Sequence, residues 1–250
     1  MKDIKKYLYT EELTRYKEDK ERVIYCDMDS VLVDFEGGLV SYFNTLLSEE
    51  LHIPHILKEA NITDLEFNRY IALIQRIKDK LGRNSIIADD LRPKYKGTKG
   101  KPYTKEWYEE DDILAFATYR LVYNNYNFWK NLKWTSYGKD LLNIIFGMQQ
   151  TTNNLIVNIL STPMLKMGVG HGCYLGKQKW VYQNIKESYM GIEVILEKEK
   201  ERYATPTSIL IDDSASNCEK FKKAGGKCIR VDTNKFDLSD FVVNLRELLL

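Results

Sequence analysis

Residues 22–35 read RVIYCDMDSVLVDF, a short apolar run that leads directly into two closely spaced aspartates. The run at 22–26 is rich in β-branched and aromatic side chains, which is typical of a buried β-strand. Asp27 and Asp29 follow where this strand should end. Ligands of open α/β sheets bind beyond the carboxyl ends of the strands. The stretch therefore predicts one strand of an α/β sheet, with a candidate site at its carboxyl end.

Four later apolar runs are also typical of strands, and stretches with helical spacing of apolar residues alternate with them. These strands are expected at 155–160, 192–196, 208–211 and 228–231. The helices are expected at 177–188, 215–224 and 239–249. Such alternation predicts a Rossmann-like, doubly wound parallel sheet of the α/β class.

An insertion separates the first strand from the second. About 130 residues lie between them, whereas a strand–helix–strand unit takes roughly 30 residues in all. Helix-compatible apolar spacing recurs in the insertion at 56–60, 65–81 and 105–124. We therefore expect an α/β core formed by 1–36 and 130–250, and a mostly helical cap at 37–129.

The composition limits the partners of this chain. Lys and Arg number 37 and Asp and Glu 36, so no overall charge would attract nucleic acid or an anionic membrane. No stretch approaches the roughly 20 apolar residues of a membrane span, and no signal-peptide pattern opens the sequence. The four cysteines contain no CxxC pair, so neither a zinc site nor a disulfide framework is indicated. We expect a cytoplasmic protein with reduced thiols and no membrane partner.

A second carboxylate pair follows another predicted strand. Asp212 and Asp213 come directly after SILI at 208–211. Either aspartate pair alone is also typical of turns and helix caps. Together with Asp27 and Asp29, however, they place four carboxylates at one edge of the sheet, where hard oxygen ligands suit Mg²⁺.

Two further elements suit a phosphate group. Ser161 and Thr162 follow the strand at 155–160, where hydroxyl and backbone N–H groups can bind phosphate oxygens. Lys200, about a dozen residues before Asp212, can neutralise charge on a transferring group. Lys198 and Arg202 are alternatives for that cation.

In this order and spacing, the constellation resembles the haloacid dehalogenase (HAD) superfamily of phosphatases. Three stretches are similar, more specifically, to the 5'(3')-deoxyribonucleotidases. They are DMDSVLVDFEGG at 27–38, LSTPMLK at 160–166 and GKQKWVYQNI at 176–185. The resemblance implies a HAD-like core with its cap inserted between the first and second motifs.

The resemblance also implies a two-step reaction. Asp27 would attack the phosphate to form an aspartyl-phosphate, while Asp29 would protonate the leaving oxygen and later activate water. Magnesium would be held by Asp27, by the backbone carbonyl of Asp29, and by Asp213 or Asp212. The hydroxyl groups of Ser161 and Thr162 and the ammonium group of Lys200 would bind the phosphate at this edge.

Two more positions match the nucleotidase motifs. Lys177 matches a lysine that would add a second positive contact to the phosphate, although a lysine there could equally face solvent from the first turn of a helix. Phe35 matches an aromatic residue that would lie against the nucleobase, and a core residue would look the same. The sequence departs from the family at Ser30, where glycine is usual, and at Ser214, where arginine often follows the second aspartate pair.

The leading hypothesis is a magnesium-dependent nucleotidase acting on small (deoxy)nucleoside monophosphates. A second is a phosphatase for nucleic-acid ends or another phosphorylated metabolite, guided by the basic segment RPKYKGTKGKP at 92–102. A third is a non-catalytic nucleotide-binding module. The sequence leaves open the base and sugar preference, the 5' or 3' position of the phosphate, the oligomeric state and the role of residues 1–20.

Overall fold

The computed structural model describes most of the chain and divides it into two compact units. The described residues are 21–48, 64–91, 114, 117–118, 121–163, 171–186 and 191–250. The first unit comprises Met1–Asp34, Lys133–Pro163 and Val181–Leu250, and the second comprises Phe35–Leu132 and Met164–Trp180. The expected helix at 56–60, the basic segment at 92–102 and most of the expected helix at 105–124 lie outside the described residues.

A five-stranded parallel sheet forms the first unit, with the strand order β3-β2-β1-β4-β5. The strands are β1 (Arg22–Cys26), β2 (Leu155–Ser161), β3 (Val194–Leu196), β4 (Ser208–Asp212) and β5 (Lys227–Arg230). Each lies within two residues of a strand expected from the sequence. The predicted α/β class and parallel sheet are therefore confirmed.

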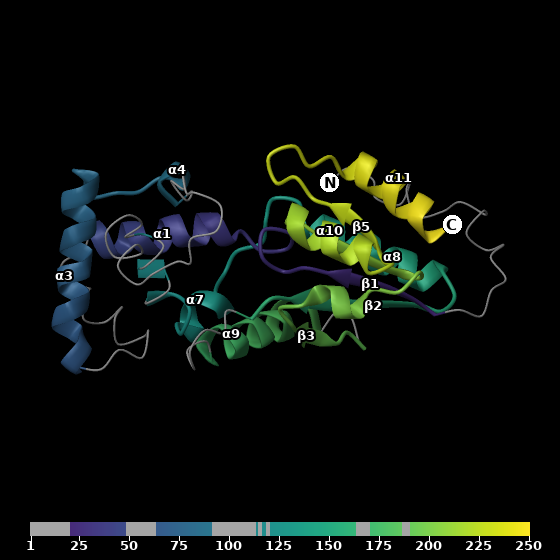
Figure 1. The fold of residues 1–250 in the computed structure, drawn as a ribbon, viewed down its shortest axis with the longest axis horizontal. Helices are drawn as coiled ribbons and strands as arrows, with labels where there is room; N and C mark the ends of the chain where they lie inside the picture. Colours follow the sequence, from purple (N-terminus) through teal and green to yellow (C-terminus); the bar gives the residue numbers. More distant parts are fainter. Residues whose placement is uncertain are drawn as a thin grey trace. The chain divides into compact units, whose positions relative to one another are not determined.

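Helices flank both faces of this sheet (Figure 1). The chain moves outward from β1 in one direction through α8 (Gly138–Thr151) to β2, and in the other through α10 (Ala215–Lys223) from β4 to β5. Because parallel connections are right-handed, these opposite directions require the two helices to lie on opposite faces. α11 (Leu238–Leu249) follows β5 and ends the chain. The chain therefore leaves β1 and β4, the strands followed by Asp27 and Asp213, near the middle of a doubly wound sheet.

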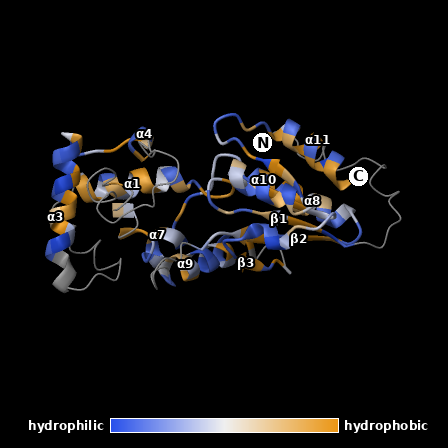
Figure 2. Cartoon of the chain, viewed as in Figure 1, coloured by the Kyte–Doolittle hydropathy of each residue, from blue (hydrophilic) through white to orange (hydrophobic). Residues whose placement is uncertain are grey.

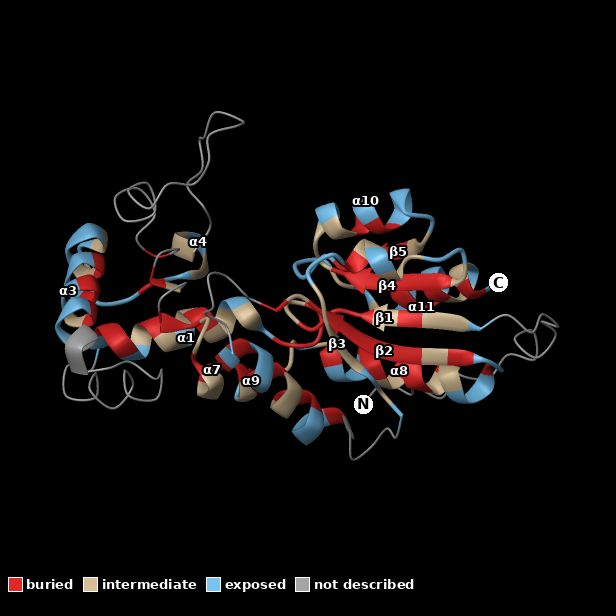
Figure 3. Ribbon diagram, turned by 60° about the horizontal axis from the view of Figure 1, so that its bottom comes forward, coloured by how far each residue is buried: buried red, intermediate tan, exposed pale blue. Residues whose placement is uncertain are grey.

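The strands are apolar because both of their faces are covered (Figures 2 and 3). All five residues of β4 are buried. Side chains alternate along a strand, so Leu210 lies on the same face as Cys228 and Leu160, and all three belong to one buried cluster with Phe221 of α10. Phe221 is fully buried in this cluster. The sheet is therefore held to α10 by a continuous apolar layer.

Every regular element described in the second unit is a helix. The unit contains α1 (Phe35–Ser48), α3 (Asp64–Leu81), α4 (Ala88–Leu91), α7 (Tyr126–Lys130) and most of α9 (His171–Val181). The helix expected at 65–81 is confirmed as α3. Its buried residues repeat at helical spacing, namely Tyr70, Leu73, Ile74 and Ile77.

α9 shows where the sequence reading was wrong. The sequence predicts a helix that begins at 177, but the helix already begins at His171. Two glycines four residues apart explain the difference, because a β-carbon at Gly172 would lie 2.0 Å from the Asn124 carbonyl oxygen and one at Gly176 would lie 2.4 Å from Trp129 Cβ. The glycines therefore allow close packing of one helix face. They also bring 171–180 into the second unit, whereas the expected cap was limited to 37–129.

The cysteines correct a second expectation. Cys218 of α10 and Cys228 of β5 form a disulfide, although the sequence indicated reduced thiols. Their Cα atoms are 5.4 Å apart, which is within the ordinary range for a disulfide. The pairing follows from packing α10 on β5 and leaves no CxxC-like signal in the sequence. Cys26 and Cys173 are free and buried.

None of the helices in the described ranges is both long enough and apolar enough to span a lipid bilayer.

Replacing Phe221 with alanine should destabilise the first unit by about 3–5 kcal/mol, because a fully buried ring would leave a cavity. Urea unfolding followed by circular dichroism measures this free energy. Val243→Ala is the matched control, since Val243 is 55% exposed and its replacement should change stability by less than about 0.5 kcal/mol. Equal effects of the two substitutions would contradict the placement of Phe221 in the core.

Candidate active site

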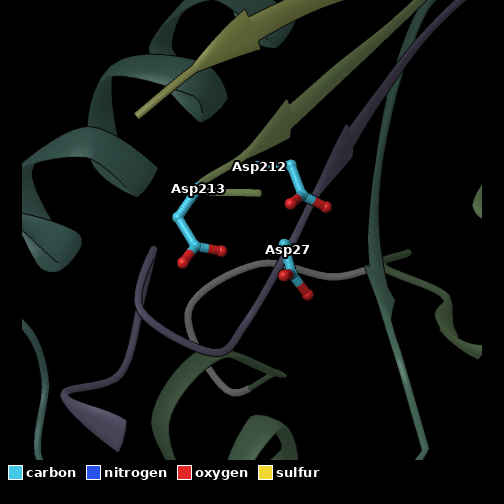
Figure 4. A group of neighbouring side chains, drawn as sticks. All are labelled: Asp27, Asp212 and Asp213. Carbon is cyan, nitrogen blue, oxygen red and sulfur yellow. The ribbon is translucent and has the colours of Figure 1, made fainter. Parts of the chain in front are cut away.

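Two strand ends bring three aspartates together. β1 and β4 are neighbours in register, with Cys26 opposite Ile211, and the Asp27 N–H donates to the Ile211 carbonyl over 2.9 Å. Asp27 and Asp212 therefore lie side by side, and Asp213 follows. One carboxylate oxygen from each of the three lies within 4.8 Å of the others (Figure 4). This is the edge at which parallel sheets bind ligands.

Lys200 supplies the positive charge of this cluster. It begins the short 3₁₀ helix η4 (Lys200–Tyr203) and is 1% exposed. Its Nζ lies 2.8 Å from Asp27 Oδ1 and 2.7 Å from Asp212 Oδ2. Burial acts to lower the pKa of Lys200, but the two carboxylates outweigh burial and raise the pKa above its ordinary value. The ammonium group therefore stays charged inside the protein.

The two alternatives for this cation face outward. Lys198 is exposed. Arg202 has a side chain that is 66% exposed and pairs with Glu199 over 2.8 Å. Of the three basic residues, only Lys200 makes an ion pair with the aspartates among the described contacts.

Asp212 is held from several sides. Besides Lys200, it accepts hydrogen bonds from the Ser214 N–H at 2.8 Å and from Asn217 Nδ2 at 3.1 Å to each carboxylate oxygen. Ser214 also caps α10, because its side chain accepts from the Asn217 N–H. The serine that replaces the expected arginine thus anchors the first turn of the helix. Both carboxylate oxygens of Asp212 therefore accept hydrogen bonds within the described residues.

The environment of Asp213 disfavours its ionised form. Burial, followed by the negative charges of Asp27 and Asp212, raises the pKa of Asp213 to about 7. A bound divalent cation would remove this penalty by neutralising the three carboxylates. Asp212 and Asp213 both lie in the carboxylate group that could hold a metal ion.

Asp29 lies on the turn that leaves β1, and its carboxylate is not one of the three clustered groups. The turn is closed by hydrogen bonds from the Ser30 N–H to Val33 and from the Leu32 N–H to Met28, each 2.9 Å long. Ser30 has a φ of 60°, a left-handed conformation that costs a non-glycine residue roughly 1 kcal/mol. Glycine adopts this conformation without such a cost.

Ser161 ends β2 at the same edge of the sheet. Because Cys26 pairs with Ile159, Ser161 lies two positions beyond the end of β1 in register. Its side chain is fully buried, and Thr162 is partly buried. Both residues therefore reach the edge at which the aspartates gather, as the sequence predicted.

Lys177 and Phe35 lie in the second unit, around one tryptophan. Lys177 Nζ is 4.9 Å from the centroid of the Trp129 ring, and Phe35 stacks on that ring at 5.3 Å with an interplanar angle of 13°. Lys177 is fully buried, so the alternative of a solvent-facing lysine is wrong. Phe35 is only partly buried and Trp129 fully buried, which leaves the phenylalanine as the ring available for contact.

Some site residues gave little or no signal in the sequence. Asn217 holds both oxygens of Asp212, and only its place in the first turn after the second aspartate pair could have indicated it. Thr135 and Tyr137 bond to the turn that carries Asp29 from more than 100 positions away in the sequence. No local pattern could have revealed these two.

Two surface hollows lie elsewhere on the first unit. Their volumes are about 460 and 520 Å³, and Glu21 and Ile156 line both. None of the three aspartates lines either hollow. The candidate site is therefore defined by the carboxylates and the sheet edge.

No protein-family model matches the chain, and no curated protein matches it. Several solved structures are similar. A HAD family enzyme from Bacteroides thetaiotaomicron, in complex with magnesium and inorganic phosphate, is 14% identical over 89% of this chain and 99% of its own, with a TM-score of 0.38. A predicted HAD-like hydrolase from Porphyromonas gingivalis is 11% identical over 90% and 98%, with a TM-score of 0.39.

A third similar structure is the L-2-haloacid dehalogenase from Xanthobacter autotrophicus, 13% identical over 91% of this chain and 83% of its own, with a TM-score of 0.39. At these identities and TM-scores, the similarity does not by itself show an activity. None of the three is described as a nucleotidase.

Replacing Lys200 with methionine should destabilise the protein by about 3–5 kcal/mol at neutral pH, because Asp27 and Asp212 would lose their buried counter-ion. Urea unfolding measures the change. Lys198→Met removes an exposed lysine two positions away and should have little effect. A Lys200→Met variant as stable as this control would contradict the buried ion pairs.

Magnesium should raise the melting temperature more at pH 8 than at pH 5.5. Without metal, the raised pKa of Asp213 makes the folded state hold a proton that the unfolded state releases, so its contribution to stability falls between about pH 4 and 7. Above pH 7 the ionised cluster binds the cation, which stabilises the fold by about 2.7 kcal/mol at a hundredfold excess over Kd. Asp213→Asn should weaken both the stabilisation and its pH dependence, whereas equal shifts at the two pH values would contradict this assignment.

Proposed function

We propose that this chain is a magnesium-dependent phosphomonoester hydrolase of the HAD type, with Asp27 as its nucleophile. The observation that carries the proposal is the buried contact of Lys200 with Asp27 at the end of β1, beside two more carboxylates. A group of two buried carboxylates, one partly buried carboxylate and one buried ammonium has a net negative charge, which is unfavourable without a cation. The arrangement suits a divalent cation and a phosphate better than it suits an apolar ligand.

The residues fit magnesium. Asp27 and Asp213 would hold it through carboxylate oxygens, together with the backbone carbonyl of Asp29. When bound, the ion neutralises charge on the phosphate and on the attacking oxygen. Carboxylate and carbonyl oxygens are the ligands that this hard cation prefers.

Asp27 is oriented for attack by two contacts on one oxygen. Its Oδ1 accepts from the Met28 N–H at 2.7 Å and from Lys200 Nζ at 2.8 Å. Its Oδ2 would attack phosphorus, forming the aspartyl-phosphate bond while the bond to the leaving oxygen breaks. Lys200 would also stabilise negative charge on the transferring group.

Asp29 would complete both steps by moving one proton. In the first step its protonated carboxyl gives that proton to the leaving oxygen, which departs as an alcohol. In the second it takes a proton from water as water attacks phosphorus, so inorganic phosphate leaves and Asp27 is restored. Ser161 and Thr162 would bind the phosphate oxygens meanwhile.

Small (deoxy)nucleoside monophosphates are the substrates that we favour, with the 5'(3')-deoxyribonucleotidase resemblance as the main support. The Phe35–Trp129 stack offers an aromatic ring to a base, and Lys177 provides a second cation in the same unit. The basic segment at 92–102 lies outside the described residues, so activity on nucleic-acid ends stays a prediction from the sequence.

The test is phosphate release from a panel of deoxy- and ribonucleoside monophosphates, sugar phosphates and 3'- or 5'-phosphorylated oligonucleotides, with magnesium or with chelator. We expect magnesium-dependent turnover, highest on deoxynucleoside monophosphates. Asp27→Asn should lower kcat by about a thousandfold or more, because the nucleophile is lost.

Asp140→Asn is the matched control, because Asp140 is exposed on α8 and should retain wild-type activity. Highest turnover on oligonucleotide ends would favour the second hypothesis. No release from any substrate would favour the non-catalytic binding module and contradict the proposal.

A further inference from the structure

The turn between β1 and α1 is held from outside by one short segment of the first unit. Val33 forms an antiparallel bridge with Trp134, flanked by hydrogen bonds of 2.9 Å from the Asp34 N–H to Lys133 and from the Thr135 N–H to Leu32. The backbone at 133–135 is thus paired with the end of the turn. Asp29 lies at the other end of the same turn.

Two side chains of this segment reach further back along the turn. Thr135 Oγ1 donates to the Val31 carbonyl at 3.0 Å, and the Tyr137 hydroxyl donates to the Ser30 carbonyl at 3.0 Å. Together with the bond from the Thr135 N–H to the Leu32 carbonyl, these bonds engage three consecutive carbonyl groups of the turn, at positions 30, 31 and 32. The Tyr137 bond is the one nearest to Asp29, since the Ser30 carbonyl is in the peptide that follows the left-handed residue.

Tyr137 is itself firmly placed. Its ring stacks on Phe236 with the centroids 4.0 Å apart. A β-carbon on the next residue, Gly138, would lie 2.5 Å from the Leu32 carbonyl oxygen, so the start of α8 lies directly against the turn. Burial, followed by the charge of Asp213, raises the pKa of Tyr137 to about 12, so the hydroxyl keeps its proton at neutral pH.

We propose that Tyr137, supported by Thr135, is a positioning residue that fixes the turn on which Asp29 sits, so that the Asp29 carboxyl faces the leaving oxygen. The inference rests on the proposed phosphohydrolase function and assigns it a residue remote in sequence. The backbone conformation of Ser30 requires such contacts. A non-glycine residue in a left-handed conformation is strained, and strain of about 1–3 kcal/mol persists only where surrounding contacts fix it.

The effect of losing this positioning should depend on the leaving group. Departure of an alkoxide needs the Asp29 proton, because alkoxides are strongly basic. A p-nitrophenolate ion departs without a proton. Loss of Asp29 positioning should therefore slow the cleavage of an alkyl phosphate and spare the cleavage of an aryl phosphate, whereas general damage to the site would slow both.

The experiment compares wild type with Tyr137→Phe, which keeps the ring stacked on Phe236 and removes one hydroxyl. kcat/KM is measured with magnesium for a deoxynucleoside 5'-monophosphate and for p-nitrophenyl phosphate. This constant reports the steps up to the first irreversible one, here departure of the leaving group, and excludes later hydrolysis of the aspartyl-phosphate. We expect a loss of about tenfold or more for the nucleotide, part of the 10²–10⁴-fold that a general acid supplies. For p-nitrophenyl phosphate we expect a change of less than about twofold.

Tyr25→Phe is the matched control, because Tyr25 is a partly buried tyrosine of the same unit whose ring packs on Phe221. It should leave both constants unchanged. Thermal unfolding of each variant shows whether the fold is retained. If Tyr137→Phe does not fold, the same comparison on Thr135→Val decides, since that variant removes the neighbouring side-chain bond to the turn.

Equal losses on the two esters, or no loss on either, would overturn the positioning role while leaving the phosphohydrolase function standing. A wild-type protein that releases phosphate from neither ester would instead overturn the proposed function, and the inference with it.

Discussion

Lys200 carries a buried ammonium group between Asp27 at 2.8 Å and Asp212 at 2.7 Å, and the rest of the site is arranged around these two ion pairs. Moving a charged group out of water costs several kcal/mol, and only close partners of opposite charge offset that cost. The fold must therefore place both carboxylates next to the Lys200 ammonium group. Any arrangement of the chain that separated the two strand ends would leave a buried charge without compensation.

The register of the sheet places Asp27 and Asp212 side by side. β1 and β4 are parallel neighbours, so the residues that follow Cys26 and Ile211 come out side by side at the carboxyl edge. Apolar side chains fix that register because β4 is buried at every position and β1 lies in the middle of the sheet. Core packing and site chemistry are thus coupled: the same strands that bury the apolar layer hold the carboxylates close enough to require a cation.

Much of this could be predicted from local sequence. The five strands were predictable because continuous apolar runs of β-branched residues between polar segments have few other interpretations. The aspartates were predictable because they follow those runs directly. Spacing from Asp212 indicated a basic residue at 198–202, but it left Lys198 and Arg202 open beside Lys200. α3 was predictable from its regular apolar repeat.

The remaining features depend on contacts between distant segments. The start of α9 at His171 depends on Gly172 and Gly176, which lie against Asn124 and Trp129, so local composition placed the start of the helix too late, at 177. The Cys218–Cys228 disulfide depends on packing α10 against β5. The grip of Tyr137 on Ser30 joins residues 107 positions apart. None of these three leaves a pattern within a single segment of sequence.

If Asp27, paired with Lys200, is the nucleophile, it becomes phosphorylated during turnover, and that intermediate can be trapped. The protein would be mixed with a deoxynucleoside monophosphate and magnesium, quenched rapidly in acid, digested, and its peptides weighed by mass spectrometry. We expect a phosphoryl group on the peptide that contains Asp27, and none on that peptide in the Asp27→Asn variant. Phosphate release without phosphorylation of that peptide, or with phosphorylation of another residue, would contradict this role of Asp27.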